Sequence, residues 1–567
     1  MKDSDSVRTA ATLSDTQAPV DSVHFGTDGW RAIIGEDFNV RSAARVAAAA
    51  ARVFKRQKQA GERYVERADG QDTEQNPEKQ GPGGESSPTS PTIIVGYDCR
   101  QDAGRYAALV ATVVAAHGFD VIVSDRYCPT PTLCWTVARN PHAVGGVMLT
   151  SSHNPAEYLG IKLRMADGGA SPADFTDEVE AELVDEVPAC FEEALANFAV
   201  AQNGTPSKPA TAPQAPFSSA DASPPDASPK DRPLSPPFRL QDIMAPYLAS
   251  LTALVDRSVI EKAGLRVVVD PLFGAGRGYL AELLRQLGVE VTEVNGEQDP
   301  SFNGLHPEPI LPWVRTGAAK VAEGGYGACF VTDGDADRIG AIDDTGAYVS
   351  SHRVLALLIG HLVEDRGQTG RVIRTRAGSN LLRRQCDRLG LALTTKPIGF
   401  KWIYEEMLKG DVLIGGEESG GIGIPSHVRE RDGLLMALLL AELMAQKGKK
   451  LHELVDDLLA TLGTLEYARR DLRLTPEQKA QLLATHVNVD TLGTESYQEL
   501  FSPLDETLVA VSSGDGIKFE LASDSWLLVR PSGTEPLVRV YAEAPTDAQV
   551  ESLLNLGCAL AQGGQNK

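Results

Sequence analysis

The feature that most constrains the fold is a repeated unit in which a short apolar run is followed by a turn and then by an amphipathic helical pattern. The run at 92–98 precedes a helical pattern near 103–117, and a second apolar run follows at 119–123. The same order recurs at 265–270, with a helical pattern near 278–287. Strands that alternate with helices of this length form βαβ units. The sequence therefore predicts α/β domains with mainly parallel sheets.

The C-terminal part of the chain follows a different pattern, in which short apolar runs lie close together. These runs are 509–511, 517–520, 526–529 and 538–541, and a helical pattern follows the last of them. Closely spaced strands without intervening helices are typical of antiparallel sheets. The predicted fold class is therefore α/β, with three βαβ-type mixed-sheet domains followed by a C-terminal α+β domain.

Two internal segments differ in composition from the rest of the chain. Residues 59–91 are rich in Gly, Pro, Ser, Glu and Gln, and residues 202–237 are rich in Pro, Ala and Ser. Such segments bury too little apolar surface to offset the entropy of ordering, so we expect both to be disordered, together with residues 1–20. The remaining chain is divided into four predicted domains, which span residues 21–201, 238–346, 347–463 and 464–567.

Charge and hydropathy argue against two classes of partner. The formal net charge is −23, whereas a nucleic-acid partner requires a basic face. The apolar run at 434–441 ends at Glu442. It is shorter than the roughly 20 residues that cross a bilayer, so it predicts a core helix and no membrane contact. Residues 1–20 contain no apolar signal segment, which predicts a cytoplasmic protein. The sequence leaves open whether the protein is a monomer or a dimer.

A serine lies where α/β proteins bind their ligands. The apolar run at 144–149 predicts a buried parallel strand, and Ser152 follows it in the stretch TSSHNP. A Ser–His hydrolase is excluded because the surrounding sequence is not G-x-S-x-G, and the adjacent His153 cannot usually form the required bond to Ser152. On this motif alone, a serine that caps a helix is the alternative.

Three aspartates recur at every second position after a predicted strand. Asp333, Asp335 and Asp337 lie in the stretch TDGDADR, and carboxylates that converge in this way are best tolerated around a hard cation. An EF-hand calcium loop does not fit, because its sixth position is Arg338 rather than Gly and its twelfth is Asp344 rather than Glu. The alternative is a solvated acidic turn.

Two further loops and one arginine offer groups that bind sugar phosphates. The stretch GGEESGG at 415–421 presents Glu417 and Ser419, an acceptor and a donor suited to vicinal hydroxyls. In FGTDGWRAIIGEDF, Arg31 is predicted to lie on a glycine-bracketed turn, available to an anion. The alternatives are ordinary polar turns and a surface arginine. A phosphate-binding concavity is predicted in RPSGTEP, from Arg530, Ser532, Gly533 and Thr534.

Taken together, these motifs describe phosphoryl transfer on a sugar. The ordered stretches TSSHNP, TDGDADR, GGEESGG and RPSGTEP resemble those of the α-D-phosphohexomutase superfamily, which includes phosphoglucomutase, phosphomannomutase and phosphoglucosamine mutase. The resemblance extends from about His24 to the C-terminus, apart from the two insertions. It implies four domains around a central cleft, the last of which binds phosphate.

The resemblance also implies roles for individual residues. Ser152 would carry a phosphoryl group and contribute to the site of one Mg²⁺ per chain, with hexose 1,6-bisphosphate as intermediate and activator. Lys162 is the first candidate for general acid and base, since cationic surroundings can lower the pKa of a lysine, and His153 is the second. The other residues that match the family's site are Asp333, Asp335 and Asp337 for the metal, Arg338 among the catalytic groups, and Arg31, Glu417, Ser419, Arg530, Ser532, Gly533 and Thr534 for the substrate.

The predicted activity is the interconversion of hexose 1-phosphate and hexose 6-phosphate, with glucose as the favoured sugar. Mannose and glucosamine phosphates are the alternative substrates, and a sugar phosphatase and a sugar-phosphate-binding pseudoenzyme are the alternative functions. Two positions depart from many relatives: Leu159 stands where an asparagine is common, and Gly421 stands where a histidine is common.

Overall fold

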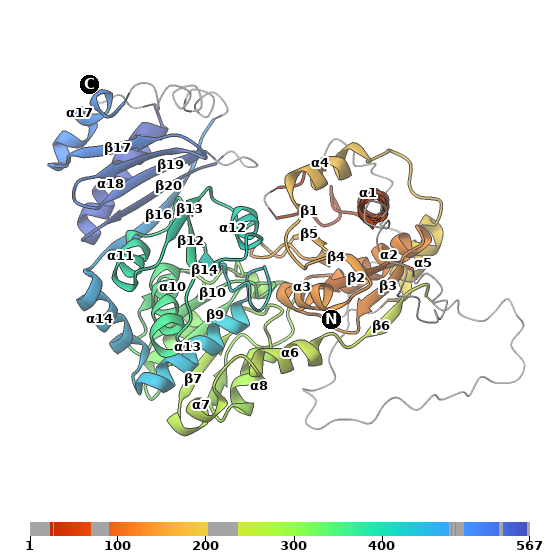
Figure 1. Ribbon diagram of the computed structural model, residues 1–567, viewed down its shortest axis with the longest axis horizontal. Helices are drawn as coiled ribbons and strands as arrows, with labels where there is room; N and C mark the ends of the chain where they lie inside the picture. Colours follow the sequence, from red (N-terminus) through yellow and green to blue (C-terminus); the bar gives the residue numbers. More distant parts are fainter. Residues whose placement is uncertain are drawn as a thin grey trace, which may run out of the picture.

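The computed structural model describes residues 23–26, 28–69, 90–201, 236–475, 478, 482, 493–531 and 537–563. Within these residues the chain forms four sheets in sequence order (Figure 1). In this view the first sheet, drawn in red to yellow, lies at one end of the molecule and the blue C-terminal sheet at the other, with the remaining two sheets between them. The predicted fold class is confirmed.

The first sheet has six strands in the order β1-β5-β4-β2-β3-β6. β2 pairs in parallel with β3 and β4, whereas β5 runs antiparallel to β4 and β1. Successive residues of β2 face opposite cores, which explains its unbroken apolar sequence. The elements are β1 (Trp30–Ile33), α1 (Val40–Asp69), β2 (Thr92–Tyr97), α2 (Ala103–Ala116), β3 (Asp120–Ser124), α3 (Thr130–Arg139), β4 (Ala143–Leu149), β5 (Tyr158–Met165), α4 (Ala173–Ala181), α5 (Phe191–Val200) and β6 (Arg239–Gln241).

The structure corrects the expected start of the first insertion. Residues 59–69 were expected to be disordered, but they continue helix α1 to Asp69. This stretch is rich in Ala, Arg, Gln and Glu, which are good helix formers, and Gly70 follows it. Residues 70–89 and 202–235 lie outside the described residues.

Strand β6 pairs in parallel with β3, so the first sheet also includes a strand that follows the second predicted insertion.

The second sheet has the order β11-β10-β9-β7-β8. β7 pairs in parallel with β8 and β9, and β10 forms an antiparallel hairpin with β9. The apolar runs that predicted β7 and β9 are buried throughout their central residues. The elements are α6 (Met244–Thr252), α7 (Arg257–Ala263), β7 (Arg266–Asp270), α8 (Tyr279–Gln286), β8 (Glu290–Glu293), α9 (Arg315–Ala322), β9 (Ala328–Thr332), β10 (Ile339–Asp343) and β11 (Tyr348–Val349).

The third sheet has the order β13-β12-β14-β15. Its helix α13 contains the apolar run at 434–441 and is the predicted core helix, because every residue of that run is buried. Asp432 caps the start of α13 by accepting a hydrogen bond from the backbone of Leu435. The elements are α10 (Ser351–Gly360), β12 (Arg371–Thr375), α11 (Asn380–Leu389), β13 (Leu393–Lys396), α12 (Phe400–Met407), β14 (Val412–Gly416), β15 (Ile422–Gly423), α13 (Gly433–Lys447) and α14 (Leu451–Leu462).

The fourth sheet is antiparallel, in the order β16-β20-β19-β18-β17, as its closely spaced apolar runs predict. Helix α18 packs on one face of this sheet. None of the helices in the described ranges is long and apolar enough to cross a membrane. The elements are β16 (Glu466–Arg473), α17 (Gln498–Phe501), β17 (Leu508–Ser512), β18 (Ile517–Leu521), β19 (Trp526–Pro531), β20 (Leu537–Ala544) and α18 (Asp547–Ala561).

The fold places three of the four motifs directly after strands. Ser152 follows β4, the three aspartates lie in the turn between β9 and β10, and the stretch at 417–421 joins β14 to β15. Each of these strands belongs to a different sheet. The three loops therefore meet where the first three domains adjoin.

Candidate active site

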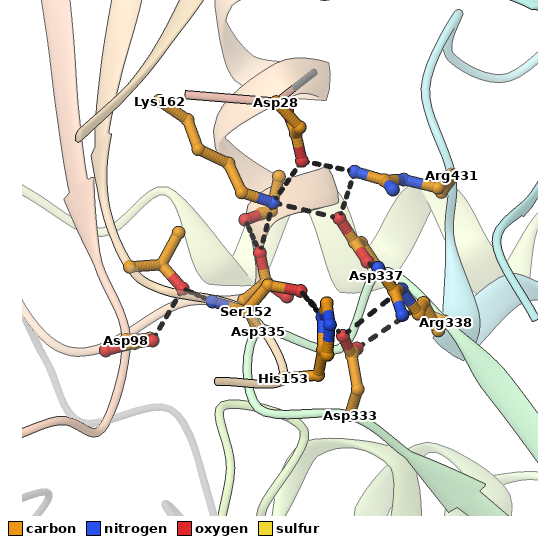
Figure 2. A network of polar contacts seen from close by, with 12 residues as sticks. Asp28, Asp98, Ser152, His153, Lys162, Asp333, Asp335, Asp337, Arg338 and Arg431 are labelled. Atoms are coloured by element: carbon orange, nitrogen blue, oxygen red, sulfur yellow. Dashed lines mark hydrogen bonds and ion pairs between the residues drawn. The ribbon is translucent and has the colours of Figure 1, made fainter. Parts of the chain in front are cut away.

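Ser152 lies buried at the junction of the first and second domains. Its hydroxyl donates a hydrogen bond to Oδ2 of Asp333 at 3.1 Å, and Nδ1 of His153 lies 3.4 Å from the same hydroxyl oxygen (Figure 2). A Cβ atom added to Gly334 would lie 2.2 Å from the carbonyl oxygen of Ser152, so only glycine allows this approach. The serine loop and the aspartate loop are therefore packed against each other.

Asp333, Asp335 and Asp337 form a cluster with no solvent-exposed surface. One carboxylate oxygen from each lies within 4.8 Å of the others. Burial raises the pKa of Asp333 well above its ordinary value, and the charges of Asp337 and Asp335 raise it further. Three buried carboxylates repel one another strongly, and a cation is needed to hold all of them ionised.

The donor set fits a hard cation. Oδ1 of Asp335 and Oδ1 of Asp337 are both buried, and neither accepts a hydrogen bond from a described residue. Carboxylate oxygens are the ligands that Mg²⁺ prefers in proteins, and a buried acceptor without a partner is costly. The aspartates, with the Ser152 oxygen beside them, can therefore hold Mg²⁺.

Lys162 reaches the aspartate cluster from β5 in the first domain. Its Nζ lies 2.7 Å from Oδ2 of Asp28, 2.8 Å from Oδ2 of Asp335 and 3.1 Å from Oδ2 of Asp337. Burial acts to lower the pKa of Lys162, but these carboxylates outweigh burial and raise it above its ordinary value. The expectation of cationic surroundings and a lowered pKa for Lys162 was wrong, because its nearest neighbours are carboxylates.

Arg431 is a second buried cation, which the sequence did not reveal. Its Nη2 lies 2.5 Å from Oδ2 of Asp28 and 2.7 Å from Oδ2 of Asp337 (Figure 2). Its Nη1 lies 3.5 Å from Oε2 of Glu417. Arg431 thus joins the first three domains. The available signal was the charged run at 429–432, directly before the apolar run of a buried helix.

The sugar loop lies against the aspartate loop. Arg338 and Gly421 form an isolated β-bridge, and the backbone N–H of Ile339 donates to the carbonyl of Gly420 at 3.0 Å. Glu417 is buried, and burial raises its pKa to about 7 although Arg431 acts to lower it. Ser419, two residues on, is half-buried. The structure therefore brings the second and third motifs together.

Arg31 and His153 lie on the first-domain side of the site. Arg31 is part of strand β1, paired with Gly160, and not of a turn as predicted; its Nη1 donates to Oδ1 of Asn154 at 2.6 Å. Burial lowers the pKa of His153 well below its ordinary value, and nearby arginines, Arg338 and Arg31 first among them, lower it further. Both effects favour the neutral form of the His153 imidazole.

Only part of the phosphate motif is described. Arg530 lies near the end of β19, where its Nε is 3.6 Å from Oδ2 of Asp515. Ser532, Gly533 and Thr534 lie outside the described residues. The phosphate-binding role of this loop stays a prediction.

Four family models match the chain in consecutive order. They are the phosphoglucomutase/phosphomannomutase alpha/beta/alpha domains I, II and III, at residues 84–187, 245–346 and 350–462, and the C-terminal domain, at residues 487–555. Each match falls within one of the four sheet-containing regions of the fold.

Individual relatives cover most of the chain. The phosphoglucomutase/phosphomannomutase of Thermococcus kodakarensis is 29% identical over 474 residues, which are 83% of this chain and 90% of the relative. A phosphoglucosamine mutase of Parafrankia sp. is 30% identical over 465 residues, 81% of this chain and 83% of the relative. A crystal structure of a protein from Thermus thermophilus, assigned as a phosphomannomutase, covers 96% of this chain and 99% of its own, with 29% identity and a TM-score of 0.71.

The matched domains run through most of the chain in one order, and the relatives align along nearly their whole length. The chain therefore belongs to the phosphoglucomutase/phosphomannomutase family, the α-D-phosphohexomutases, and is an intramolecular phosphotransferase of that type.

Proposed function

We propose that this phosphohexomutase acts on glucose phosphates through a phosphoserine at residue 152. The observation that carries the proposal is the contact between the Ser152 hydroxyl and Asp333, at a buried carboxylate cluster. Each of its other two members has one oxygen that accepts no hydrogen bond from a described residue. A nucleophilic oxygen beside a cation site is the arrangement that phosphoryl transfer requires.

In the proposed reaction, the bond between phosphorus and Ser152 Oγ breaks as a bond forms between phosphorus and the free hydroxyl oxygen of a hexose monophosphate. The product, hexose 1,6-bisphosphate, then reorients within the site. It returns its other phosphoryl group to Ser152. Mg²⁺, when bound by Asp333, Asp335 and Asp337, would offset negative charge on the transferring group. Lys162 and His153 are the two candidates to carry the hydroxyl proton.

The substrate contacts are proposed from the same site. Glu417 and Ser419 would accept and donate hydrogen bonds to sugar hydroxyls, while Arg31 and the loop at Arg530 would bind the phosphate that is not being transferred. Because the bisphosphate binds in two orientations in turn, the phosphate loop must hold either end of the sugar. Arg338 and Arg431 add positive charge beside the aspartate and sugar loops.

A sugar phosphatase would use the same phosphoserine with water as the acceptor. Ser152 has no exposed surface, so the site has to open to admit either acceptor, and a site that closes again around a sugar phosphate would exclude water during the transfer. Transfer to a sugar and release of inorganic phosphate are separable in a single assay, so the two functions are readily distinguished.

Ser152→Ala should reduce turnover at least roughly 10³-fold, because covalent transfer has no substitute, while sugar-phosphate binding survives. Intact-mass measurement should find one phosphoryl group on the wild-type protein and none on the variant. Ser151→Ala is the matched control, since Ser151 is equally buried but its hydroxyl has no hydrogen-bond partner among the described residues. Near-normal activity of Ser152→Ala would refute the assignment.

Mg²⁺ should raise the melting temperature of the wild-type protein, because it binds the folded cluster and not the unfolded chain. At a Mg²⁺ concentration one hundred times Kd, this stabilisation would be about 2.7 kcal/mol. Asp335→Asn should reduce the rise in melting temperature that Mg²⁺ causes, and it should lower kcat more than it weakens substrate binding. Asp125→Asn, at a surface pair with Arg126, is the control and should preserve both the Mg²⁺-dependent rise and kcat. Equal melting shifts in the two variants, or full activity in excess chelator, would exclude the metal role.

The preference for glucose is proposed by analogy, since FGTDGW and GGEESGG resemble the motifs of phosphoglucomutase-type members. The kcat/KM for glucose 1-phosphate should exceed that for mannose 1-phosphate, with glucosamine 1-phosphate lower still, as coupled assays with each sugar would show. A preference for glucosamine 1-phosphate of more than roughly tenfold, or about 1.4 kcal/mol in transition-state binding, would overturn the sugar assignment and leave the mutase chemistry standing.

A further inference from the structure

Arg100, which follows β2, encloses the backbone of the serine loop. Its Nη1 donates to the carbonyl oxygens of Pro155 at 2.7 Å and Tyr158 at 2.9 Å. Its Nη2 donates to the carbonyl oxygens of Ser152 at 2.6 Å and Asn154 at 2.7 Å. The side chain of Arg100 has no exposed surface. One guanidinium group therefore fixes four carbonyls of the loop that carries the nucleophile.

The same guanidinium belongs to a network that also holds the N–H of Ser152. Nε of Arg100 donates to Oδ2 of Asp98 at 3.2 Å, and the hydroxyl of Thr150 donates to that oxygen at 2.6 Å. The backbone N–H of Ser152 donates to Oγ1 of Thr150 at 2.9 Å. Both backbone polar groups of Ser152 are thus fixed by one connected set of side chains.

Ser152 needs this support because its backbone is strained. Its φ is 51°, in the left-handed region that side chains other than glycine rarely adopt. Such a conformation persists only where the surroundings over-determine it, and it sets the direction of the hydroxyl. The Arg100 guanidinium also lies over the ring of Phe302 in the second domain, 4.9 Å from its centre. Arg100 therefore contacts both domains that meet at Ser152.

We propose that Arg100 is a positioning residue for phosphoryl transfer: its planar fork holds Ser152 in the strained conformation that directs Oγ at the aspartate cluster. This proposal rests on the proposed role of Ser152. Lysine cannot replace this guanidinium group. An ammonium group has three N–H donors on a single nitrogen, whereas the planar guanidinium group of Arg100 donates to four carbonyl oxygens from two nitrogens. Displacing a reacting group by about 1 Å can cost roughly 10²-fold in rate.

Arg100→Lys should reduce kcat roughly 10²-fold while KM changes less than about threefold, and it should increase the phosphate released to water for each isomerisation. Amide hydrogen exchange of residues 150–158 should become faster in the resting protein. Arg105→Lys is the matched control, because Arg105 also donates to a backbone carbonyl, that of Phe198 at 3.0 Å, and lies 4.2 Å from the centre of its ring. This control should preserve kcat, phosphate release and the exchange of 150–158.

A second pair of variants keeps the test valid if Arg100→Lys folds poorly. Thr150→Val removes the hydroxyl that accepts from the Ser152 backbone N–H, so it should lower kcat and speed amide exchange of residues 150–158. Thr150→Ser keeps a hydroxyl and should retain the wild-type kcat and exchange rate. Unchanged exchange and unchanged kcat in Arg100→Lys and Thr150→Val would overturn the positioning role. Amide exchange is measured without substrate, so it tests the positioning role of Arg100 independently of the mutase activity. A failure of the proposed function, which the wild-type assay would reveal, is therefore distinguishable from a failure of this proposal.

Discussion

The rest of the structure depends on how three buried carboxylates are neutralised. Asp333, Asp335 and Asp337 lie on one short turn with no exposed surface, and their mutual repulsion has to be offset by cations. The protein provides Lys162 from the first domain and Arg431 from the third. These ion pairs connect the first three domains, which also share one hydrophobic core.

This arrangement connects domain packing to chemistry. Asp28 lies between Lys162 and Arg431 and accepts from Arg164 as well, so burial, which would raise its pKa, is outweighed and its pKa stays well below the ordinary value. Asp335 and Asp337 are consequently held by fixed cations, whereas Asp333, the carboxylate that accepts from Ser152, has Arg338 as its nearest cation, at 3.8 Å. Preorganised charge of this kind contributes to catalysis because it does not have to be rearranged during the reaction.

The sequence was informative where a pattern is local. Apolar runs and helical periodicity located β2, α2, β9 and the four predicted strands of the last sheet, and the predicted serine, aspartate and sugar loops do follow strands, namely β4, β9 and β14. Arg431 and Asp28 were missed because they pair across 403 residues, and no local pattern records such a contact. The pKa of Lys162 was predicted with the wrong sign for the same reason: two of the three carboxylates around it come from another domain.

The central claim is that the phosphoryl group passes from Ser152 to a sugar and not to water. The most direct measurement is to label the phosphoserine with ³²P, remove all unbound label and sugar phosphate, and add glucose 6-phosphate for a single turnover. The label should appear in glucose 1,6-bisphosphate before any appears in inorganic phosphate. Release of the label as inorganic phosphate, at the same rate with and without the sugar phosphate, would contradict it.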